Sequence, residues 1–458
     1  MLYDVAIIGC GPIGALLANL LGKRGHSVLV LERQKSPYPL PRAIHFDGEA
    51  MRCFQAAGLA KEIEAHTHVG KGMLFQNAAG ETLVDWSRDQ VPGPMGWYES
   101  YRFYQPGLEA ELRNGFARFD QIHLQQDCDV AGLIQTDDSV QIEMGNGQTA
   151  SARYVIGCDG AQSMTRQAMG ANLHDLGFQE RWLVVDVLLK RPRDDLGDYS
   201  IQFCDPEEPG TYVRGVEDRR RWELRLRPGD PDVFPPDLVW QRLSRWITPE
   251  DADLERFAVY TFRSRIATQW RKHRCMIAGD AAHQMPPFMG QGMCAGVRDA
   301  ANLWWKLSAV LNGANPDLLD SYQSEREANA RAFIEMSVNL GRLINQTAAG
   351  VVPKGQMKSI WPDLGPGLHG DAVHGGVLAP QVRNTDGTLA DTAVNHGFYV
   401  LAREPVGSPI QAFVGARDWL AERDLLGVVI RPDGYSLGGF KDLADLSDLI
   451  APIRGLHF

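Results

Sequence analysis

Apolar positions near the start of the chain alternate between strand-like and helix-like spacing. Residues 3–9 form a short apolar and β-branched run, residues 15–21 have the spacing of a buried helix, and residues 28–31 form a second apolar run. Short strands separated by a helix of this kind are typical of a βαβ unit with parallel strands. The chain is therefore expected to begin with an α/β domain.

The apolar pattern changes between residues 178 and 265, where the helical period gives way to strand alternation. Short strands with turn residues between them predict an antiparallel sheet, which could cover a pocket. Strands are predicted at 73–86, 140–144, 182–187, 199–203, 211–216, 222–226, 259–262, 398–402, 411–414 and 427–430. Helices are predicted at 49–65 with a break at Gly58, and at 106–119, 295–311, 317–339 and 418–425.

These changes in pattern predict a discontinuous domain organisation. Residues 1–72, 101–177 and 266–345 are expected to form a Rossmann-like nucleotide-binding domain. Residues 73–100 and 178–265 are expected to form an inserted antiparallel sheet domain that binds the substrate. Residues 346–376 are rich in Gly and Pro and are predicted to be a linker, and residues 377–458 a small α/β appendage without cysteine.

Composition narrows the class of protein. A length of 458 residues favours two or three domains. The net charge of −11 argues against nucleic acid or an anionic membrane surface as the main partner. The local exception is the run of three arginines at 219–221, which is interpreted as a solvated turn. The seven scattered cysteines predict a reduced, cytoplasmic protein without disulfides or a metal site. No apolar run is long enough to predict a membrane span.

The first motif lies in the predicted βαβ unit. Gly9, Gly11 and Gly14 follow the pattern Gly-x-Gly-x-x-Gly after the first strand, and Glu32 ends the second strand. Glycines in this turn let the backbone approach a pyrophosphate, and an acid at the second strand end can hold a ribose hydroxyl. The unit predicts dinucleotide binding and disfavours NADP here, because Glu32 would repel a 2′-phosphate. It leaves the choice between NAD and FAD open.

Two further motifs combine a strand end with an acid and glycines. Asp159 and Gly160 follow an apolar strand, with Ser163 placed to cap the next helix; the alternative is a simple turn. The third motif runs from 279 to 293: a strand ends at Gly279 and Asp280, two prolines form a rigid turn, and Gly-x-Gly precedes a long helix. An open helix N-terminus beside a carboxylate suits a large ligand with hydroxyls and electron-rich carbonyls.

Single residues outside these motifs are weaker candidates. Arg42 lies in a proline-dense segment that could fold back over the phosphates, or on the surface. Gln105 begins a predicted helix, as a cofactor contact or as a cap. Four polar residues in the predicted sheet are candidate substrate contacts, although solvent exposure is the alternative for each: Tyr212, Arg214, Glu223 and Arg225.

The three motifs occur in order along the chain, and the set resembles the class A FAD-dependent aromatic hydroxylases, a group of flavoprotein monooxygenases. The resemblance is strongest for the branch of 3-(3-hydroxyphenyl)propionate hydroxylase and phenol hydroxylase. It is supported by the stretches 41–47, 182–186, 290–300 and 320–326. Residues 377–458 are similar to the thioredoxin-like appendage of that group but lack cysteine, so a structural or dimer-contact role is implied, and a homodimer is left open.

The resemblance implies a role for each motif residue. The FAD pyrophosphate would face Gly9, Gly11 and Gly14, and the adenosine ribose would face Glu32 and Arg33. Along the rest of the cofactor would lie Arg42, Gln105, Asp159, Gly160, Gly279 and Asp280. The flavin pyrimidine edge would meet Gly290, Gly292 and Met293, while Pro286 and Pro287 would separate the flavin from the substrate.

The resemblance also implies the reaction. NADH or NADPH would reduce FAD, and O2 would form a C4a-hydroperoxide that hydroxylates a small phenol or aromatic acid. His45 is the candidate base, although a packed or solvated histidine is the alternative, and Pro287 would border the reacting atoms. His45 stands where the propionate hydroxylases are expected to have glycine, which puts that substrate in doubt.

Other functions compete with this interpretation. One is an FAD enzyme of another class: an epoxidase, a halogenase or a tailoring oxygenase on a polycyclic substrate. A non-catalytic nucleotide sensor and a plain NAD dehydrogenase are further alternatives. The dehydrogenase is disfavoured because it has no use for the second and third motifs.

Overall fold

The structure, a computed structural model, describes residues 1–348 and 360–458. The predicted linker 346–376 lies partly outside the described residues.

A mostly parallel sheet forms the first layer. Its central order is β18-β11-β1-β2-β8, all parallel, and β9, β10 and β17 extend it in antiparallel fashion. The strands are β1 (Leu2–Ile8), β2 (Val28–Leu31), β8 (Ile122–Gln125), β9 (Val130–Gln135), β10 (Val140–Met144), β11 (Thr149–Gly157), β17 (Arg271–Lys272) and β18 (Cys275–Ile277). The first strands are apolar because this sheet is covered, and the predicted βαβ unit is confirmed.

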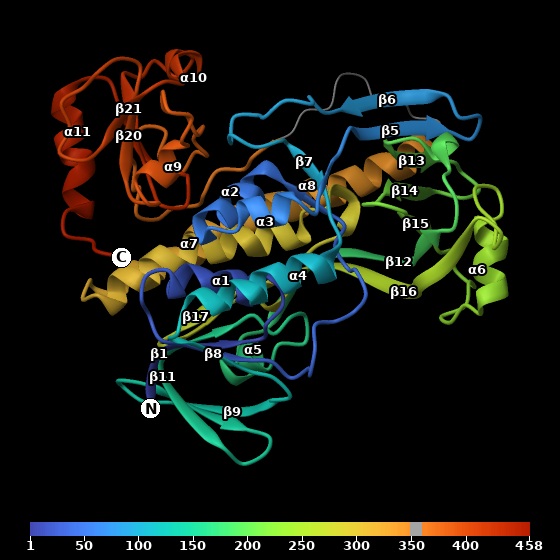
Figure 1. The fold of residues 1–458 in the computed structure, drawn as a ribbon, viewed down its shortest axis with the longest axis horizontal. Helices are drawn as coiled ribbons and strands as arrows, with labels where there is room; N and C mark the ends of the chain where they lie inside the picture. Colours follow the sequence, from blue (N-terminus) through green and yellow to red (C-terminus); the bar gives the residue numbers. More distant parts are fainter. Residues whose placement is uncertain (349–359) are drawn as a thin grey trace.

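Helices pack over this sheet around one buried helix, α7 (Figure 1). α7 is buried along nearly its whole length, since α1, α2 and α8 pack against it. Its N-terminus is thereby fixed in the interior of the molecule. The helices are α1 (Pro12–Gly22), α2 (Gly48–Ala57), α3 (Ala60–Glu64), α4 (Gln105–Asn114), α5 (Met164–Ala168), α7 (Gly292–Leu311) and α8 (Asp320–Ala348).

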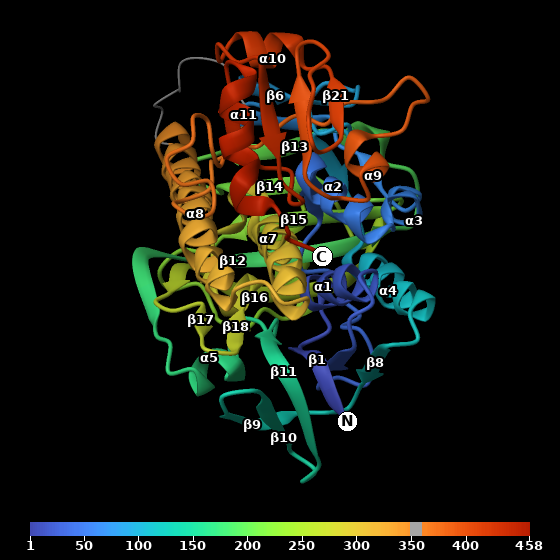
Figure 2. The ribbon, with the colours of Figure 1, turned by 90° about the vertical axis from the view of Figure 1, so that its left-hand side faces the viewer.

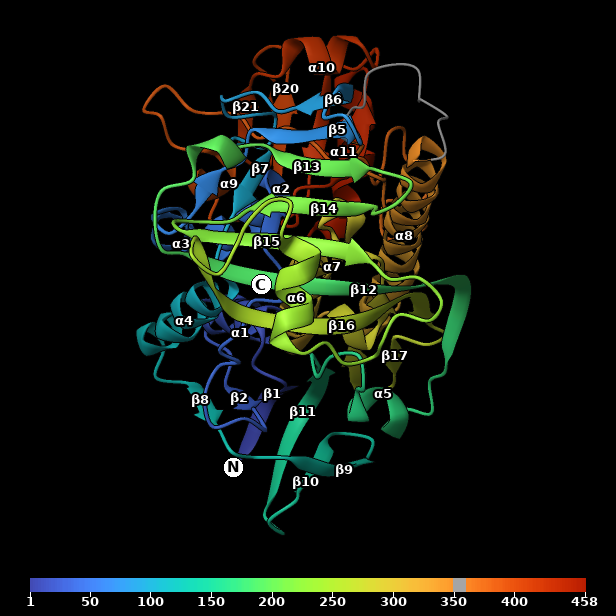
Figure 3. The ribbon, with the colours of Figure 1, turned by 90° about the vertical axis from the view of Figure 1, so that its right-hand side faces the viewer.

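A second sheet has the order β19-β16-β12-β15-β14-β13-β5-β6, antiparallel except for the pair β13 and β5. Its outer face carries an apolar cluster that includes side chains of α6 (Pro236–Leu243). Figure 3 shows this helix lying over that face of the sheet. Its inner face points toward the N-terminal end of α7. The strands are β5 (Gly72–Asn77), β6 (Thr82–Ser87), β12 (Leu173–Leu189), β13 (Ser200–Cys204), β14 (Gly210–Arg214), β15 (Arg219–Arg225), β16 (Ala252–Ala267) and β19 (His283–Gln284).

A small antiparallel sheet lies beside α2 and the start of α7, next to the second sheet. It consists of β3 (His45–Asp47), β7 (Ser100–Arg102) and β4 (His68–Val69). Its register pairs Arg102 with His45 on one side and with His68 on the other, so the three side chains form one row.

The C-terminal residues form a separate α/β layer, drawn in red above α7 in Figure 2. Its sheet has the order β21-β20-β22-β23. The elements are β20 (Tyr399–Ala402), β21 (Ala412–Val414), β22 (Gly427–Ile430), β23 (Ser436–Phe440), α9 (Ala390–Ala393), α10 (Arg417–Ala421) and α11 (Leu443–Ile450). The first three strands and α10 agree with the sequence prediction, whereas β23 and α11 were missed.

Two local predictions have clear outcomes. The helical stretch 49–65 is indeed broken at Gly58, which ends α2 with a φ of +72°. The interpretation of the arginines at 219–221 as a solvated turn is wrong. They begin β15, and Arg220 and Arg221 are buried.

Candidate active site

Three glycines build the turn between β1 and α1, and they differ in their surroundings. A Cβ on Gly9, where φ is +99°, would lie 2.4 Å from the backbone oxygen of Cys158. A Cβ on Gly14 would lie 2.0 Å from the oxygen of Gly9, so close packing requires glycine at both positions. At Gly11 no described atom lies within 4 Å of an added Cβ. Because Gly11 precedes the open N-terminus of α1, this side of the turn fits a pyrophosphate.

Glu32 ends β2 beside this turn. Its carboxylate accepts hydrogen bonds from the backbone N–H of Cys10 at 2.7 Å and of Gln34 at 2.9 Å. The side chain therefore fixes the turn. Arg33, the next residue, is exposed.

Arg113 lies at the same turn and was missed by the sequence reading. Its Nη2 donates to the backbone oxygen of Cys10 at 2.7 Å, while its Nε and Nη1 are buried without a hydrogen-bond partner among the described residues. The available signal was spacing: Gln105, Glu109 and Arg113 recur every four residues along one face of α4. Glu109 lies 3.7 Å from Nη2, while the Nε and Nη1 groups beside the turn could donate to an anionic ligand.

The segment around Arg42 is held from both sides. Gln105 Oε1 accepts from the backbone N–H of Arg42 at 3.1 Å and of the next residue at 2.7 Å, so Gln105 supports this segment. From the second sheet, Arg221 donates to the backbone oxygens of Pro41 and Arg42 at 2.9 and 2.8 Å. Asp186 neutralises Arg221 at 2.7 Å. The Arg42 side chain itself is exposed.

The second motif has a local structural role. Asp159 accepts hydrogen bonds from the backbone N–H of Thr165 at 2.9 Å and its hydroxyl at 3.0 Å, and also from Ser163. Ser163 accepts from the N–H of Arg166, which confirms its predicted capping role. Gly160 has a φ of +76°, and no described atom lies within 4 Å of an added Cβ. Both carboxylate oxygens of Asp159 are thus directed at the N-terminus of α5.

The third motif combines an accessible acid with a buried support. The Asp280 side chain is solvent-accessible, yet the surrounding protein raises its pKa by desolvation, against the opposing charge of Arg42. Gly279 has a φ of +63° and donates its N–H to Asp299 at 2.9 Å. Asp299 also binds His283 at 2.6 Å, and this buried pair holds the turn that presents Asp280.

The N-terminus of α7 is open toward the inner face of the second sheet. Gln291 occupies its cap position without a side-chain hydrogen bond to the helix N–H groups, within the described residues. Gly290 has a φ of +64°, and a Cβ there would lie 2.7 Å from His45 Nδ1. Gly292 and Met293 begin the helix, so their N–H groups face the same direction. Pro286 is buried just before this turn.

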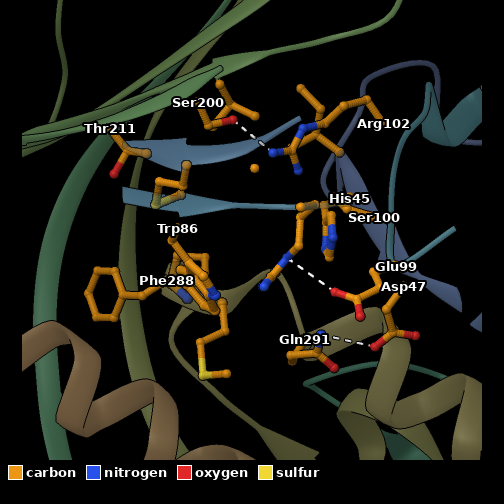
Figure 4. Close-up of a pocket in the computed structure, with 18 of the residues that line it drawn as sticks. His45, Asp47, Trp86, Glu99, Ser100, Arg102, Ser200, Thr211, Phe288 and Gln291 are labelled. Carbon is orange, nitrogen blue, oxygen red and sulfur yellow. Dashed lines mark hydrogen bonds and ion pairs between the residues drawn. The ribbon is translucent and has the colours of Figure 1, made fainter. Parts of the chain in front are cut away.

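A cavity of about 120 Å³ lies where this helix end, the small sheet and the second sheet meet (Figure 4). Pro287 lines it. Its apolar walls include Met73, Trp86, Val213, Phe288, Met289 and Phe333. Its polar walls include His45, Arg88, Glu99, Arg102, Ser200, Thr211, Glu223 and Gln291.

His45 lies in this cavity, but its ring is a weak base. Burial, together with the positive charge of Arg102, lowers the pKa of His45 to about 3. Its Nδ1 is buried against Gly290 without a hydrogen-bond partner among the described residues. A neutral imidazole at this position favours hydrogen bonding or shape over proton abstraction at neutral pH.

Only one of the four sheet candidates lines this cavity. Glu223 lines the cavity opposite its register partner Thr211. Tyr212 does not line it, because alternation turns its ring to the outer face, 5.0 Å from the ring of Trp222. Arg214 forms an ion pair with Asp198 at 3.4 Å. Arg225 forms an ion pair with Glu180 at 3.4 Å and a hydrogen bond with Asn345 at 2.8 Å. Neither arginine lines the cavity.

A buried polar chain connects the cavity to the C-terminal layer. Gln291 donates to Asp47 at 3.0 Å, and Arg298 binds Asp47 at 2.5 Å and Glu49 at 2.6 Å. The Tyr435 hydroxyl donates to Glu49 at 2.8 Å. Burial alone would raise the pKa of Asp47, but Arg298 holds it below its ordinary value. The sequence reading missed this connection, since its members are far apart in the chain.

Two further features are absent from the described residues. Among them, no group of His, Cys, Asp and Glu is arranged to hold a metal ion. No helix in this part of the chain is both long and apolar enough to cross a membrane.

Comparison with known proteins adds family information. Residues 2–337 match the model of a family described as FAD binding domain. The chain is 38% identical to a probable NADH-specific resorcinol 4-hydroxylase of Rhodococcus jostii (strain RHA1), covering 97% of this chain and 93% of that one. It is 40% identical to a 3-(3-hydroxy-phenyl)propionate/3-hydroxycinnamic acid hydroxylase of Mycolicibacterium gilvum (strain PYR-GCK), covering 75% of this chain but 60% of that one.

Solved structures support the fold. Aklavinone-11 hydroxylase, in a complex with FAD and aklavinone, has a TM-score of 0.79 at 22% identity and covers 99% of both chains. The p-nitrophenol 4-monooxygenase of Pseudomonas putida DLL-E4 has a TM-score of 0.68 at 23% identity, covering 75% of this chain and 89% of that one. At these identities the likeness concerns the α/β fold alone.

The two kinds of glycine in the first turn lead to a matched prediction. Gly11→Val should leave the unfolding midpoint of the FAD-free protein nearly unchanged, yet weaken FAD binding by at least about tenfold, because the side chain fills the space next to the helix N-terminus. Gly14→Ala should instead lower the unfolding midpoint, since its Cβ meets backbone. Thermal unfolding and FAD titration measure both. A Gly11→Val protein that binds FAD like the wild type contradicts the assignment.

Proposed function

The chain belongs to the FAD-binding family of class A flavin-dependent aromatic hydroxylases, and we propose that it uses NADH and O2 to hydroxylate a single-ring phenol. Resorcinol, named for the relative that matches along 97% of this chain, is the first candidate. The propionate hydroxylases are weaker guides, because the match spans only 60% of the Mycolicibacterium relative.

The cavity is the observation that carries this proposal. Its volume of about 120 Å³ is close to that of an engineered cavity of about 150 Å³ that binds benzene. One ring fits such a space, whereas a tailoring substrate with several fused rings would extend beyond it. Size therefore favours a monocyclic phenol over the polycyclic alternative.

The residues present fit FAD along the predicted path. The open side of Gly11 and the N-terminus of α1 would hold the pyrophosphate, with Arg113 as an added partner. The accessible carboxylate of Asp280 would hold ribityl hydroxyls, and the N–H groups of Gly292 and Met293 the pyrimidine carbonyl. Bound FAD supplies the redox chemistry, accepting reducing equivalents from NADH and activating O2.

The protein's own tasks are to orient the ring and to limit water. Trp86, Phe288 and Phe333 give the cavity apolar walls that suit an aromatic ring. Pro287 and the turn that ends at Gly290 lie between these walls and the start of α7. Excluding water here would favour oxygen transfer to the substrate over unproductive decay of the activated oxygen.

Glu223 is the better candidate for the base. Its carboxylate lines the cavity, and burial raises its pKa above the ordinary value, against the attraction of Arg221 at 3.7 Å. A raised pKa makes a carboxylate a stronger proton acceptor. We assign Glu223 to receive the proton from the substrate's phenolic oxygen, while the neutral His45 contributes shape and hydrogen bonding.

The purified FAD-loaded protein should oxidise NADH faster in the presence of resorcinol and other monocyclic phenols, with formation of hydroxylated product. Polycyclic phenols should give neither stimulation nor product, because the cavity holds one ring. NADH consumption and product analysis by liquid chromatography measure both. A yellow protein whose NADH oxidation no phenol stimulates would point to the sensor alternative.

Glu223→Gln should lower kcat/KM for the phenol by about a hundredfold to ten-thousandfold, the usual contribution of a general base. The base must be ionised to act. Wild-type kcat/KM should therefore fall as pH drops through the raised pKa of Glu223, and this limb should vanish in the variant. FAD content checks that the site is intact. An unchanged pH profile in Glu223→Gln excludes the role.

A further inference from the structure

One arginine in the cavity wall lacks the partners that other buried arginines have. Arg102 is 7% exposed, and its single hydrogen bond among the described residues runs from Nη2 to the Ser200 hydroxyl at 2.8 Å. Arg220 and Arg166 each donate to two backbone carbonyls. The remaining buried arginines lie within ion-pair distance of a carboxylate: Arg52, Arg221, Arg256, Arg298, Arg326 and Arg431.

The charged neighbours do not compensate Arg102. Arg88 and Arg214 add positive charge, and each is near its own acid, Glu99 at 3.9 Å and Asp198 at 3.4 Å. Burial, with these two cations, lowers the pKa of Arg102 to about 10, so the guanidinium is still charged at neutral pH.

The two side chains in register with Arg102 cannot supply negative charge either. His45 and His68 flank it on the neighbouring strands, and burial lowers the pKa of both imidazoles. The row is therefore a neutral ring, a cation and a neutral ring. A buried cation with one neutral acceptor is unfavourable unless an anion joins it.

The position of Arg102 indicates where that anion would lie. Figure 4 shows the Arg102 guanidinium at the cavity, hydrogen-bonded to Ser200, with Thr211 on the neighbouring strand and His45 below. The cavity that we assign to the aromatic ring is the same one. A planar guanidinium with free N–H groups binds oxygen anions well.

We propose that Arg102 binds an anionic oxygen of the single-ring substrate, a phenolate or a carboxylate. This inference rests on the proposed function and adds a specificity determinant to it. The enzyme would then prefer the ionised form of its ligand over a neutral ring of the same shape. A phenol that loses its proton to Glu223 would leave its negative charge where Arg102 can stabilise it.

Ligand pairs that differ in charge test the proposal on the FAD-loaded protein. Phenol, p-cyanophenol and p-nitrophenol increase in acidity, and their methyl ethers are neutral controls of similar shape. Benzoate and benzamide form the carboxylate arm. Affinities are measured from the change in flavin absorbance at one pH, for wild type, Arg102→Met, Arg102→Lys and Arg227→Met, a control on an exposed arginine paired with Glu207.

In the wild type, affinity should rise with the acidity of the phenol, or benzoate should bind more tightly than benzamide. A response in the phenol series identifies the bound oxygen as a phenolate, and a response in the benzoate pair identifies it as a carboxylate. Arg102→Met should weaken anion binding about tenfold to a hundredfold, because a hydrogen bond to a charged group contributes about 1.5–3 kcal/mol. Neutral ligands should be affected little. Arg102→Lys should keep part of the preference, and Arg227→Met all of it.

Two results would overturn the inference. One is a wild type that binds methyl ethers and benzamide as tightly as the anions, which decides the matter even if Arg102→Met does not fold. The other is an FAD-loaded Arg102→Met protein with undiminished anion preference. Failure of the proposed function looks different: the wild type would show no phenol-stimulated NADH oxidation, whatever its ligand preference.

Discussion

The ion group around Arg298 fixes the geometry on which the cavity depends. This guanidinium is 2% exposed and is held by Asp47 and Glu49, while its third contact, at 2.9 Å, is the side-chain oxygen of Gln291. It thereby ties the small sheet, α2 and the start of α7 together. Removing one partner from such a buried group costs about 3–5 kcal/mol, so these elements cannot shift independently. The position of the open N-terminus of α7 is therefore coupled to the small sheet and to α2.

The same group reaches the C-terminal layer through the hydrogen bond between Tyr435 and Glu49. A second buried cluster of charges also joins this layer to the helices. Arg431 binds Glu325 of α8 at 2.7 Å, and Lys306 of α7 binds the same carboxylate at 2.7 Å. Burial lowers the pKa of Lys306 to about 8. The cysteine-free layer therefore supports α7 and α8 through paired charges. The charges in these supports are paired, whereas Arg102 in the cavity wall has no ion-pair partner among the described residues, and the proposed role of Arg102 rests on this contrast.

Local patterns predicted the parts of the fold that local forces determine. Strand and helix periods identified the βαβ unit, most of the second sheet and the break at Gly58. The meeting of distant strands was not predictable, because Arg102 of the small sheet reaches Ser200 and Thr211 of the second sheet only in the folded chain. Alternation alone placed Tyr212 among the substrate candidates, although its strand turns it to the outer face. The motif glycines were found from their fixed spacing after a strand, while Arg113 gave only a weaker signal, its spacing from Gln105 and Glu109 along α4.

A crystal structure of the FAD-loaded protein with bound resorcinol is the most direct test of this account. The account predicts one aromatic ring in the cavity between Trp86 and Phe288, beside the start of α7, with an oxygen within hydrogen-bond distance of the Arg102 guanidinium. A ring bound outside this cavity, or one whose oxygens all point away from Arg102 while FAD occupies its predicted path, would contradict it.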